Sequence, residues 1–131
     1  MAIKLNPDYA KAHYNLGNAL SAERKIEEAI SHYKMAIKLN PDLAIAHYNL
    51  GIALVAEGKN EEAISHYKMA IKLKPDFALA HNNLGIVLFN AKMTEEAIDY
   101  FKEAIRIRPG FAEAQKNLET ALRSVEVQDL F

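Results

Sequence analysis

Apolar residues recur at every third or fourth position along most of the chain, a spacing typical of amphipathic helices. The first such stripe consists of Ala10, His13, Leu16, Gly17 and Leu20. A second stripe with the same spacing follows, made of Ala29, Ile30, Tyr33, Ala36 and Ile37. We therefore predict a pair of helices in this part of the chain, with each stripe facing a common core, and no sheet.

The same pattern returns with a period of 34 residues. The four prolines lie at positions 7, 41, 75 and 109. A Leu-Gly pair recurs at Leu16, Leu50 and Leu84, and a Glu-Glu-Ala-Ile segment recurs at Glu27, Glu61 and Glu95. A fixed period of this length indicates one supersecondary unit copied along an axis. Because Asp8, Asp42 and Asp76 each follow a proline, we expect them to cap the first helix of each unit.

The residues at these positions resemble the tetratricopeptide repeat family over essentially the whole chain. The first repeat has His13, Leu16, Gly17, Leu20, Ala29, Tyr33, Ala36 and Pro41. The second has His47, Leu50, Gly51, Leu54, Ala63, Tyr67, Ala70 and Pro75, and the third has His81, Leu84, Gly85, Leu88, Ala97, Phe101, Ala104 and Pro109. Histidine stands where the family often has Trp or Tyr. The resemblance implies an all-α, right-handed superhelical solenoid in which the small residues lie at close helix crossings.

The repeat pattern also sets the expected organisation of this single domain. We assign residues 10–43, 44–77 and 78–111 to three repeats and residues 112–124 to a polar capping helix, in which Glu119 replaces the repeated glycine. Residues 1–9 are expected to be the remnant of a preceding repeat, because the first eight residues are repeated exactly at 35–42. That would make the chain a piece of a longer array. Residues 125–131 are expected to be a frayed tail or a short docking segment.

Composition and charge narrow the classes of function. The net charge of −1 gives no basic face for nucleic acid. The absence of cysteine excludes disulfides and thiolate metal sites. No apolar run is long enough for a signal peptide or a membrane span. From these features we expect a soluble, cytoplasmic protein that does not act on nucleic acid or membranes.

A second stripe on each first helix is the candidate binding surface. In tetratricopeptide arrays this stripe lines a concave groove, and the resemblance implies the same groove here. Residues 7–40 and 41–74 differ at only seven of 34 positions, and three of these are Lys11/Ile45, Asn18/Ile52 and Ser21/Val55 on that stripe. Drift on an exposed face tends to give polar residues, so the change to Ile and Val favours binding of an amphipathic helix or an extended apolar segment. The predicted groove residues are Tyr14, Asn15, Asn18, Ile45, Tyr48, Asn49, Ile52, Val55, Leu79, Asn82, Asn83, Ile86, Phe89 and Asn117.

An asparagine recurs on this stripe at Asn15, Asn49, Asn83 and Asn117. This row resembles the asparagine ladder in the repeat domain of the O-linked N-acetylglucosamine transferases, in which case the amides would hold a peptide backbone. The alternative is a structural asparagine that satisfies the carbonyl group of a neighbouring loop.

The heat-shock-chaperone class of these repeats uses a clamp of three basic residues and two asparagines. Asn18 and Asn49 match two of its five positions, but Tyr14, Leu79 and Asn83 replace the basic residues, so an acidic C-terminal tail is not the expected ligand.

Nothing in the sequence indicates catalysis or a cofactor. The adjacent Glu27 and Glu28 diverge around a helix and do not form an acid–base pair. His13, His47 and His81 are one repeat apart, roughly 10 Å, which is too far for a shared zinc ion, and we expect none at His32 or His66. We therefore predict a protein-interaction scaffold. The alternatives are the substrate-recognition fragment of a larger enzyme, such as a glycosyltransferase, or a solenoid that self-associates end to end through Ile3 and Leu5.

Overall fold

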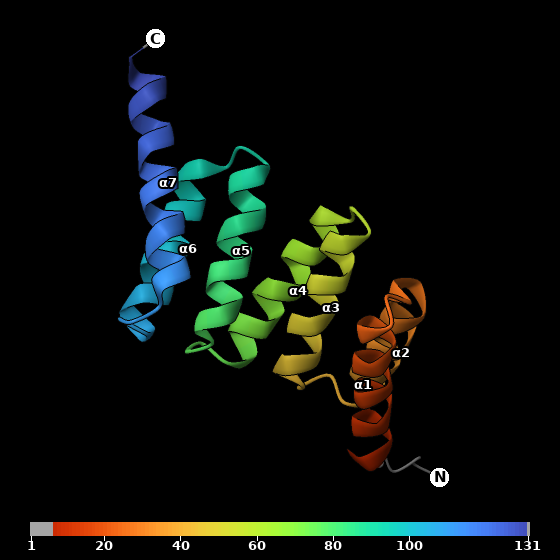
Figure 1. Ribbon diagram of the computed structural model, residues 1–131. Helices are drawn as coiled ribbons and strands as arrows, with labels where there is room; N and C mark the ends of the chain where they lie inside the picture. The colour runs from red at the N-terminus through yellow and green to blue at the C-terminus, as the bar shows by residue number, and fades with distance from the viewer. Residues whose placement is uncertain (1–6, 131) are drawn as a thin grey trace. The chain divides into compact units, whose positions relative to one another are not determined.

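The computed structural model describes residues 7–130. Within that range the chain forms helices joined by short turns, with no strand (Figure 1). The helices are α1 (Pro7–Ala22), α2 (Ile26–Leu39), α3 (Ala44–Ala56), α4 (Asn60–Leu73), α5 (Ala78–Asn90), α6 (Thr94–Ile107) and α7 (Ala112–Asp129). This order confirms the prediction of an all-α chain of helix pairs. None of the described helices is long and apolar enough to span a bilayer.

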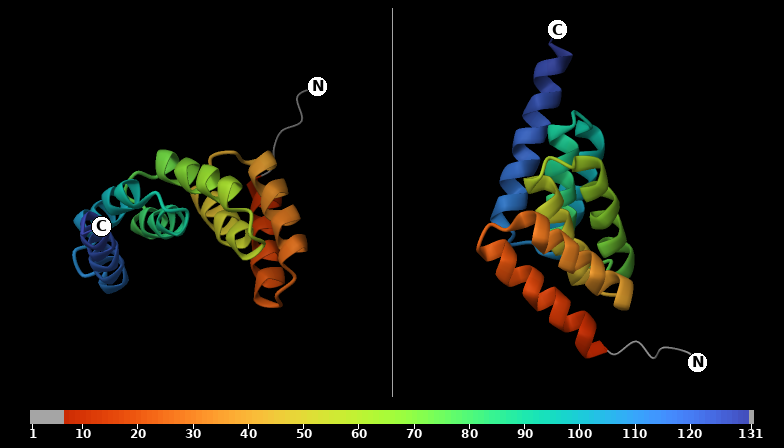
Figure 2. Two further views of the ribbon diagram at one scale, coloured as in Figure 1. Left: turned by 90° about the horizontal axis from the view of Figure 1, so that it is seen from above. Right: turned by 90° about the vertical axis from the view of Figure 1, so that its right-hand side faces the viewer.

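The chain divides into two compact units between Leu73 and Lys74. In the first unit, α1 packs on α2, α2 on α3, and α3 on α4. In the second unit, α6 packs on both α5 and α7, and Figure 2 shows α6 beside α7. Around α7, the core of the second unit includes Ala78, Ala104, Phe111 and Ala114.

A glycine on each first helix lets the second helix of the same repeat approach closely. A Cβ atom added to Gly51 would lie 2.6 Å from Cε1 of Tyr67, and one added to Gly85 would lie 2.5 Å from Cε1 of Phe101. The aromatic ring therefore occupies the space that any other residue's side chain would need. This agrees with the predicted close crossing, and the aromatic ring repeated on each second helix is the group that fills it.

The position of Leu16 corrects the predicted core. Its counterparts Leu50 and Leu84 are completely buried, but Leu16 is 45% exposed. The helix α3 packs on α2 of the preceding repeat as well as on α4, whereas among the described helices α1 packs mainly on α2. The apolar stripe of α1 is therefore only partly covered, and the outer part of it faces solvent.

The expected aspartate caps are also corrected. The helices α3 and α5 begin two residues after Asp42 and Asp76, and their N-cap residues Leu43 and Phe77 make no side-chain capping hydrogen bond. Phe77 is 7% exposed. Burying such a side chain is worth about 1.5–3 kcal/mol, more than the ~1 kcal/mol of a polar cap, so packing decides where the helix begins.

Both ends of the described chain differ from the predicted boundaries. Residues 1–6 of the expected remnant, with Ile3 and Leu5, lie outside the described residues, and residues 7–9 belong to α1. At the other end α7 continues past Ser124 to Asp129, so residues 125–129 are helical and not frayed. This stretch contains no glycine or proline to stop the helix. Glu119 is exposed and pairs with Arg123 one turn later.

Candidate peptide-binding surface

In the first unit, the predicted groove residues lie on α1 and α3. Ile45, Ile52 and Val55 are 38%, 41% and 37% exposed. They are spaced three or seven residues apart, so α3 presents them on one face. The half-buried residues Tyr14, Asn18, Tyr48 and Asn49 belong to the same two helices, and Asn15 is exposed. Exposed branched apolar side chains in a row are a common feature of surfaces that bind other polypeptides.

A hydrogen-bond network joins α1, α2 and α3 beneath this row. The side-chain amide of Asn49 donates to the hydroxyl oxygen of Tyr14 at 3.1 Å and to Oδ1 of Asn18 at 3.2 Å. The hydroxyl group of Tyr33 donates to the same Oδ1 at 2.6 Å. Burial, together with the neighbouring Tyr14, raises the pKa of Tyr33, so its hydroxyl group stays protonated and remains a donor. Both amide hydrogens of Asn49 are therefore used within the protein.

The second unit carries the remaining predicted residues on α5 and α7. Leu79 is 40% exposed, and Asn83, Ile86, Phe89 and Asn117 are half-buried. Asn82 was predicted to line the groove, but its side chain is buried, with only 1% of its surface exposed. Its Oδ1 accepts a hydrogen bond of 3.0 Å from the side-chain amide of Asn117.

Two of the four repeated asparagines bond to side chains of other helices, and not to the loop carbonyl group of the alternative prediction. Asn49 donates to Tyr14, 35 residues earlier, and Asn117 donates to Asn82, also 35 residues earlier. In both cases the amide joins one first helix to an earlier first helix of the same unit. In both contacts the two residues are 35 positions apart, one repeat period plus one residue, and this spacing is visible in the sequence. The side-chain carbonyl group of Asn49 makes none of these bonds.

A pocket of about 330 Å³ lies beside the row on α3. It is lined by Lys11 and Tyr14 of α1, Asn40 and Leu43 of the connecting turn, and Ile45 of α3. It is large enough to admit an apolar side chain, and Lys11 is the only charged residue in its lining. It extends the row of exposed apolar residues toward the N-terminal ends of α1 and α3.

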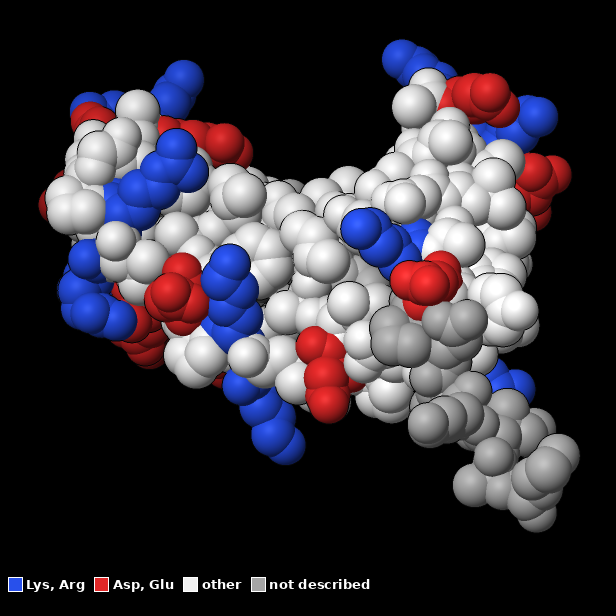
Figure 3. All heavy atoms as spheres, turned by 90° about the horizontal axis from the view of Figure 1, so that it is seen from below, with Lys and Arg blue, Asp and Glu red and all other residues white. Residues whose placement is uncertain are grey.

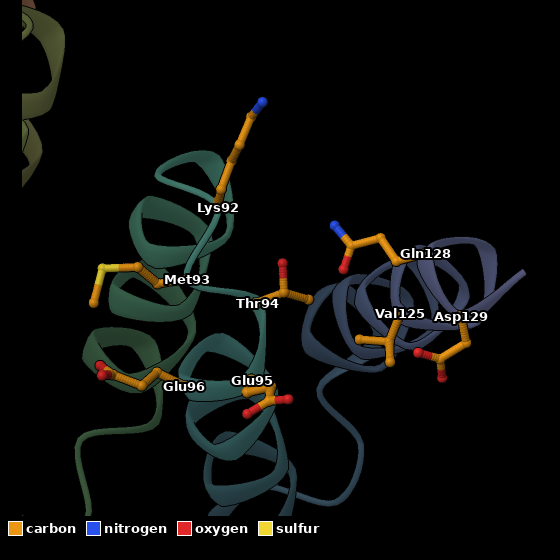
Figure 4. Close-up of a pocket in the computed structure, with 8 residues that line it drawn as sticks. All are labelled: Lys92, Met93, Thr94, Glu95, Glu96, Val125, Gln128 and Asp129. Atoms are coloured by element: carbon orange, nitrogen blue, oxygen red, sulfur yellow. The ribbon is translucent and has the colours of Figure 1, made fainter. Parts of the chain in front are cut away.

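A second pocket, of about 430 Å³, lies between the start of α6 and the end of α7 in the second unit (Figure 4). Figure 4 shows Glu95 facing Val125 and Asp129, while Lys92 and Met93 point away. The carboxylates here belong to solvent-exposed residues. Among the described residues there is no group of three or more His, Cys, Asp or Glu side chains that could hold a metal ion.

Charge does not single out either unit. On the face drawn in Figure 3, Lys and Arg side chains are interspersed with Asp and Glu side chains. The ion pairs among the described residues lie between exposed side chains, as between Lys34 and Glu62 at 3.8 Å. Such pairs contribute little to stability. A partner of this surface would therefore be chosen by shape and apolar contact more than by net charge.

These observations define an α-helical repeat protein. A family model described as "Tetratricopeptide repeat" matches residues 10–43 and 78–111, a second with the same description matches residues 32–65, and one described as "TPR repeat" matches residues 53–91. The chain belongs to the tetratricopeptide repeat family. A search of curated proteins found no match.

Three solved structures with the same fold share less than a quarter of the sequence. The first TPR of Spaghetti (RPAP3), bound to the HSP90 peptide SRMEEVD, is 22% identical with a TM-score of 0.91, over 95% of this chain and 99% of that chain. The Sgt2 TPR domain from Aspergillus fumigatus is 23% identical with a TM-score of 0.87, over 93% and 82% of the two chains. The Arabidopsis OM64 TPR domain is 19% identical with a TM-score of 0.87, over 90% and 98%.

Proposed function

We propose that the chain is a protein-interaction scaffold that binds an extended, largely apolar polypeptide segment along α1 and α3 of its first unit. The observation that carries this proposal is the row of exposed Ile45, Ile52 and Val55 on α3. When a partner covers these branched apolar side chains, the complex is stabilised by roughly 25 cal/mol for each Å² of apolar surface buried. The adjoining pocket beside Lys11 would receive one apolar side chain of the same segment.

The hydrogen bonds of Asn49 favour an extended segment over a helix. Its amide hydrogens are bonded to Tyr14 and Asn18, which leaves its carbonyl oxygen as the group available to a ligand. An extended backbone has free N–H groups along its length, whereas a helix has free N–H groups only in its first turn. Asn49 would therefore accept a hydrogen bond from the ligand backbone while its own amide keeps α1 and α3 in register.

The ligand is expected to differ from that of the neighbouring Spaghetti structure, which holds an HSP90 peptide. Tyr14, Leu79 and Asn83 stand where that class of repeat has basic residues. We infer that an acidic tail is not the preferred ligand and that the chain itself is not an enzyme. Recognition of substrates for a larger enzyme and end-to-end self-association remain the alternative roles, and the cytoplasmic location remains a prediction.

The test compares one substitution on each face of the first unit. A partner is first identified by pull-down, and a peptide from it is then titrated against the parent, Ile52→Asp and Lys68→Glu. Ile52→Asp should weaken binding about thirtyfold, which corresponds to the ~2 kcal/mol of a buried anchor. Lys68 is exposed on the second helix α4, and its substitution should leave the affinity unchanged. Normal binding by Ile52→Asp with loss in Lys68→Glu would move the site to the second helices.

A further inference from the structure

The structure pairs the histidines in a way that the 34-residue period does not suggest. Nδ1 of His13 lies 3.0 Å from Nδ1 of His32, and Nδ1 of His47 lies 3.0 Å from Nδ1 of His66. In each pair the ring centroids are 5.3 Å apart, and the rings are stacked. Each pair joins the first helix of a repeat to the second helix of the same repeat, and each is only partly buried.

A backbone contact fixes the tautomer of His47. Its Nε2 lies 3.2 Å from the carbonyl oxygen of Pro41, so Nε2 carries the hydrogen and donates it. Its Nδ1 then has a lone pair directed at His66, and His66 supplies the hydrogen of the Nδ1–Nδ1 contact. Histidines that ligate metals usually donate their other ring nitrogen to a carbonyl group in this way, a contact that holds the ring and raises the basicity of the free nitrogen.

The third repeat lacks the second histidine and serves as an internal comparison. Tyr100 takes the place of His66, with its ring centroid 5.9 Å from that of His81. Nε2 of His81 again bonds the carbonyl oxygen of a proline, Pro75, at 3.0 Å. The Nδ1 atom of His81 is buried and has no hydrogen-bond partner among the described residues. Burial, with Glu96 and Asp99 nearby, raises the pKa of Tyr100, so no phenolate replaces the missing imidazole.

We propose that each of the two histidine pairs chelates one Cu²⁺ or Ni²⁺ ion through its two Nδ1 atoms. Once the two rings turn so that both lone pairs meet beside the line joining the nitrogens, two nitrogens 3.0 Å apart, each about 2.0 Å from a metal, subtend an angle of roughly 95° at that metal. This is close to the angle between neighbouring ligands in square-planar and octahedral coordination, which Cu²⁺ and Ni²⁺ adopt with nitrogen and oxygen ligands. It is narrower than the tetrahedral angle of structural zinc sites. Water completes the coordination, because no third protein ligand joins either pair among the described residues.

The proton balance of the binding step follows from the tautomers. His47 already presents an unprotonated Nδ1, and His66 moves its hydrogen from Nδ1 to Nε2 when the metal takes its place. Both rings stay neutral, and no proton is released from a neutral pair. At lower pH the pair gains a proton that the metal must displace, so binding weakens as the pH falls. Glu62 raises the pKa of His66 and Lys34 lowers it, and these two residues form an ion pair at 3.8 Å.

The experiment titrates Cu²⁺ into the full chain, without a histidine tag, in a buffer that does not chelate metals. The parent should bind two ions beyond the background of the His32→Tyr, His66→Tyr double variant, and His66→Tyr alone should bind one. These substitutions copy the pair found in the third repeat, and circular dichroism checks that the variants remain folded. Two-ion binding that persists in the double variant, or no saturable binding by the parent, would refute the assignment.

Two further measurements do not depend on those variants. Tyr100→His should create a third pair with His81 and add a third ion, and failure of the folded variant to do so would count against the geometry. In the unmodified chain, paramagnetic Cu²⁺ should broaden the imidazole NMR signals of His13, His32, His47 and His66 before that of His81. Equal broadening of all five histidines would indicate unspecific binding and overturn the proposal.

Discussion

The first two repeats differ at seven of 34 aligned positions, yet they bury the same residue type very differently. Leu16 of α1 is 45% exposed, whereas Leu50 of α3 is completely buried. The difference lies in the neighbours, because α3 packs on α2 and α4 and α1 packs mainly on α2. In a repeat protein the contribution of a residue is thus set partly by the adjacent repeat.

Contacts between the two helices of one repeat, in contrast, have nearly the same geometry in the first and second repeats. A Cβ atom on Gly17 would lie 2.7 Å from Cε1 of Tyr33, nearly the same as the 2.6 Å between the corresponding atoms at Gly51 and Tyr67. The two histidine pairs also share one Nδ1–Nδ1 distance of 3.0 Å. Contacts between the two helices of one repeat are therefore intrinsic to its sequence.

The largest effect is expected from Gly51→Leu, which attacks a contact within a repeat. Tyr67 fills the space beside Gly51, so the leucine side chain would force the ring or the whole of α4 to move. We expect a loss of several kcal/mol in the free energy of unfolding, above the roughly 1–3 kcal/mol of ordinary overpacking. Urea unfolding followed by circular dichroism measures it. Gly110→Leu is the control, because nothing lies within 4 Å of a Cβ atom there. Equal urea midpoints for Gly51→Leu and Gly110→Leu would contradict the close crossing of α3 and α4.

A second prediction tests the contact between repeats. Leu50→Ala should cost about 2–4 kcal/mol, because it leaves a cavity in a closed core. Leu16→Ala should cost less than about 1 kcal/mol, because that side chain is partly in solvent and alanine favours helix. Thermal and urea unfolding of both variants give the two values. Similar losses at both positions would show that α1 and α3 are covered equally in solution.

The same division explains what the sequence could predict. The period, the helix pairs and the need for Gly51 follow from residues that meet within one repeat. The exposure of Leu16 depends on a neighbouring helix, which the local pattern does not contain. The start of α5 was missed because burying Phe77 outweighs capping by Asp76.

For the candidate site, the sequence predicted the exposed row on α3 but not which polar groups are already bonded. The helical stripe identifies Ile52 as a surface residue from spacing alone. Asn82 lies at the same repeat position as Tyr14, but its shorter side chain is buried and bonded to Asn117. The face-to-face histidines were missed because His47 and His66 are 19 residues apart, a separation set by the turn and the crossing of two helices.

A third, smaller effect concerns pH. Burial lowers the pKa of His47, and burial with the neighbouring His47 and Lys34 lowers the pKa of His66, from an ordinary value of 6.5. The folded state therefore takes up protons less readily than the unfolded chain. Stability should be full above pH 6.5 and fall as the pH drops through the lowered pKa values. Melting temperatures between pH 7.5 and 5 measure this, and the fall should be shallower in His66→Tyr. An equal slope would place the titrating group elsewhere.

The smallest effect is expected at the turn between the two helices of a repeat, where the first two repeats can be exchanged residue for residue. Arg24 has a φ of 63°, and Gly58 at the same position of the second repeat has a φ of 75°. A side chain in this left-handed region costs roughly 1 kcal/mol, and glycine avoids that cost but loses more backbone freedom on folding. Arg24→Gly should therefore stabilise the chain by up to about 1 kcal/mol, and Gly58→Arg should destabilise it by a similar amount. Both turns are exposed, so neither change disturbs packing. Urea midpoints that shift in the same direction for the two exchanges would show that side-chain contacts, and not the backbone conformation, set the stability of these turns.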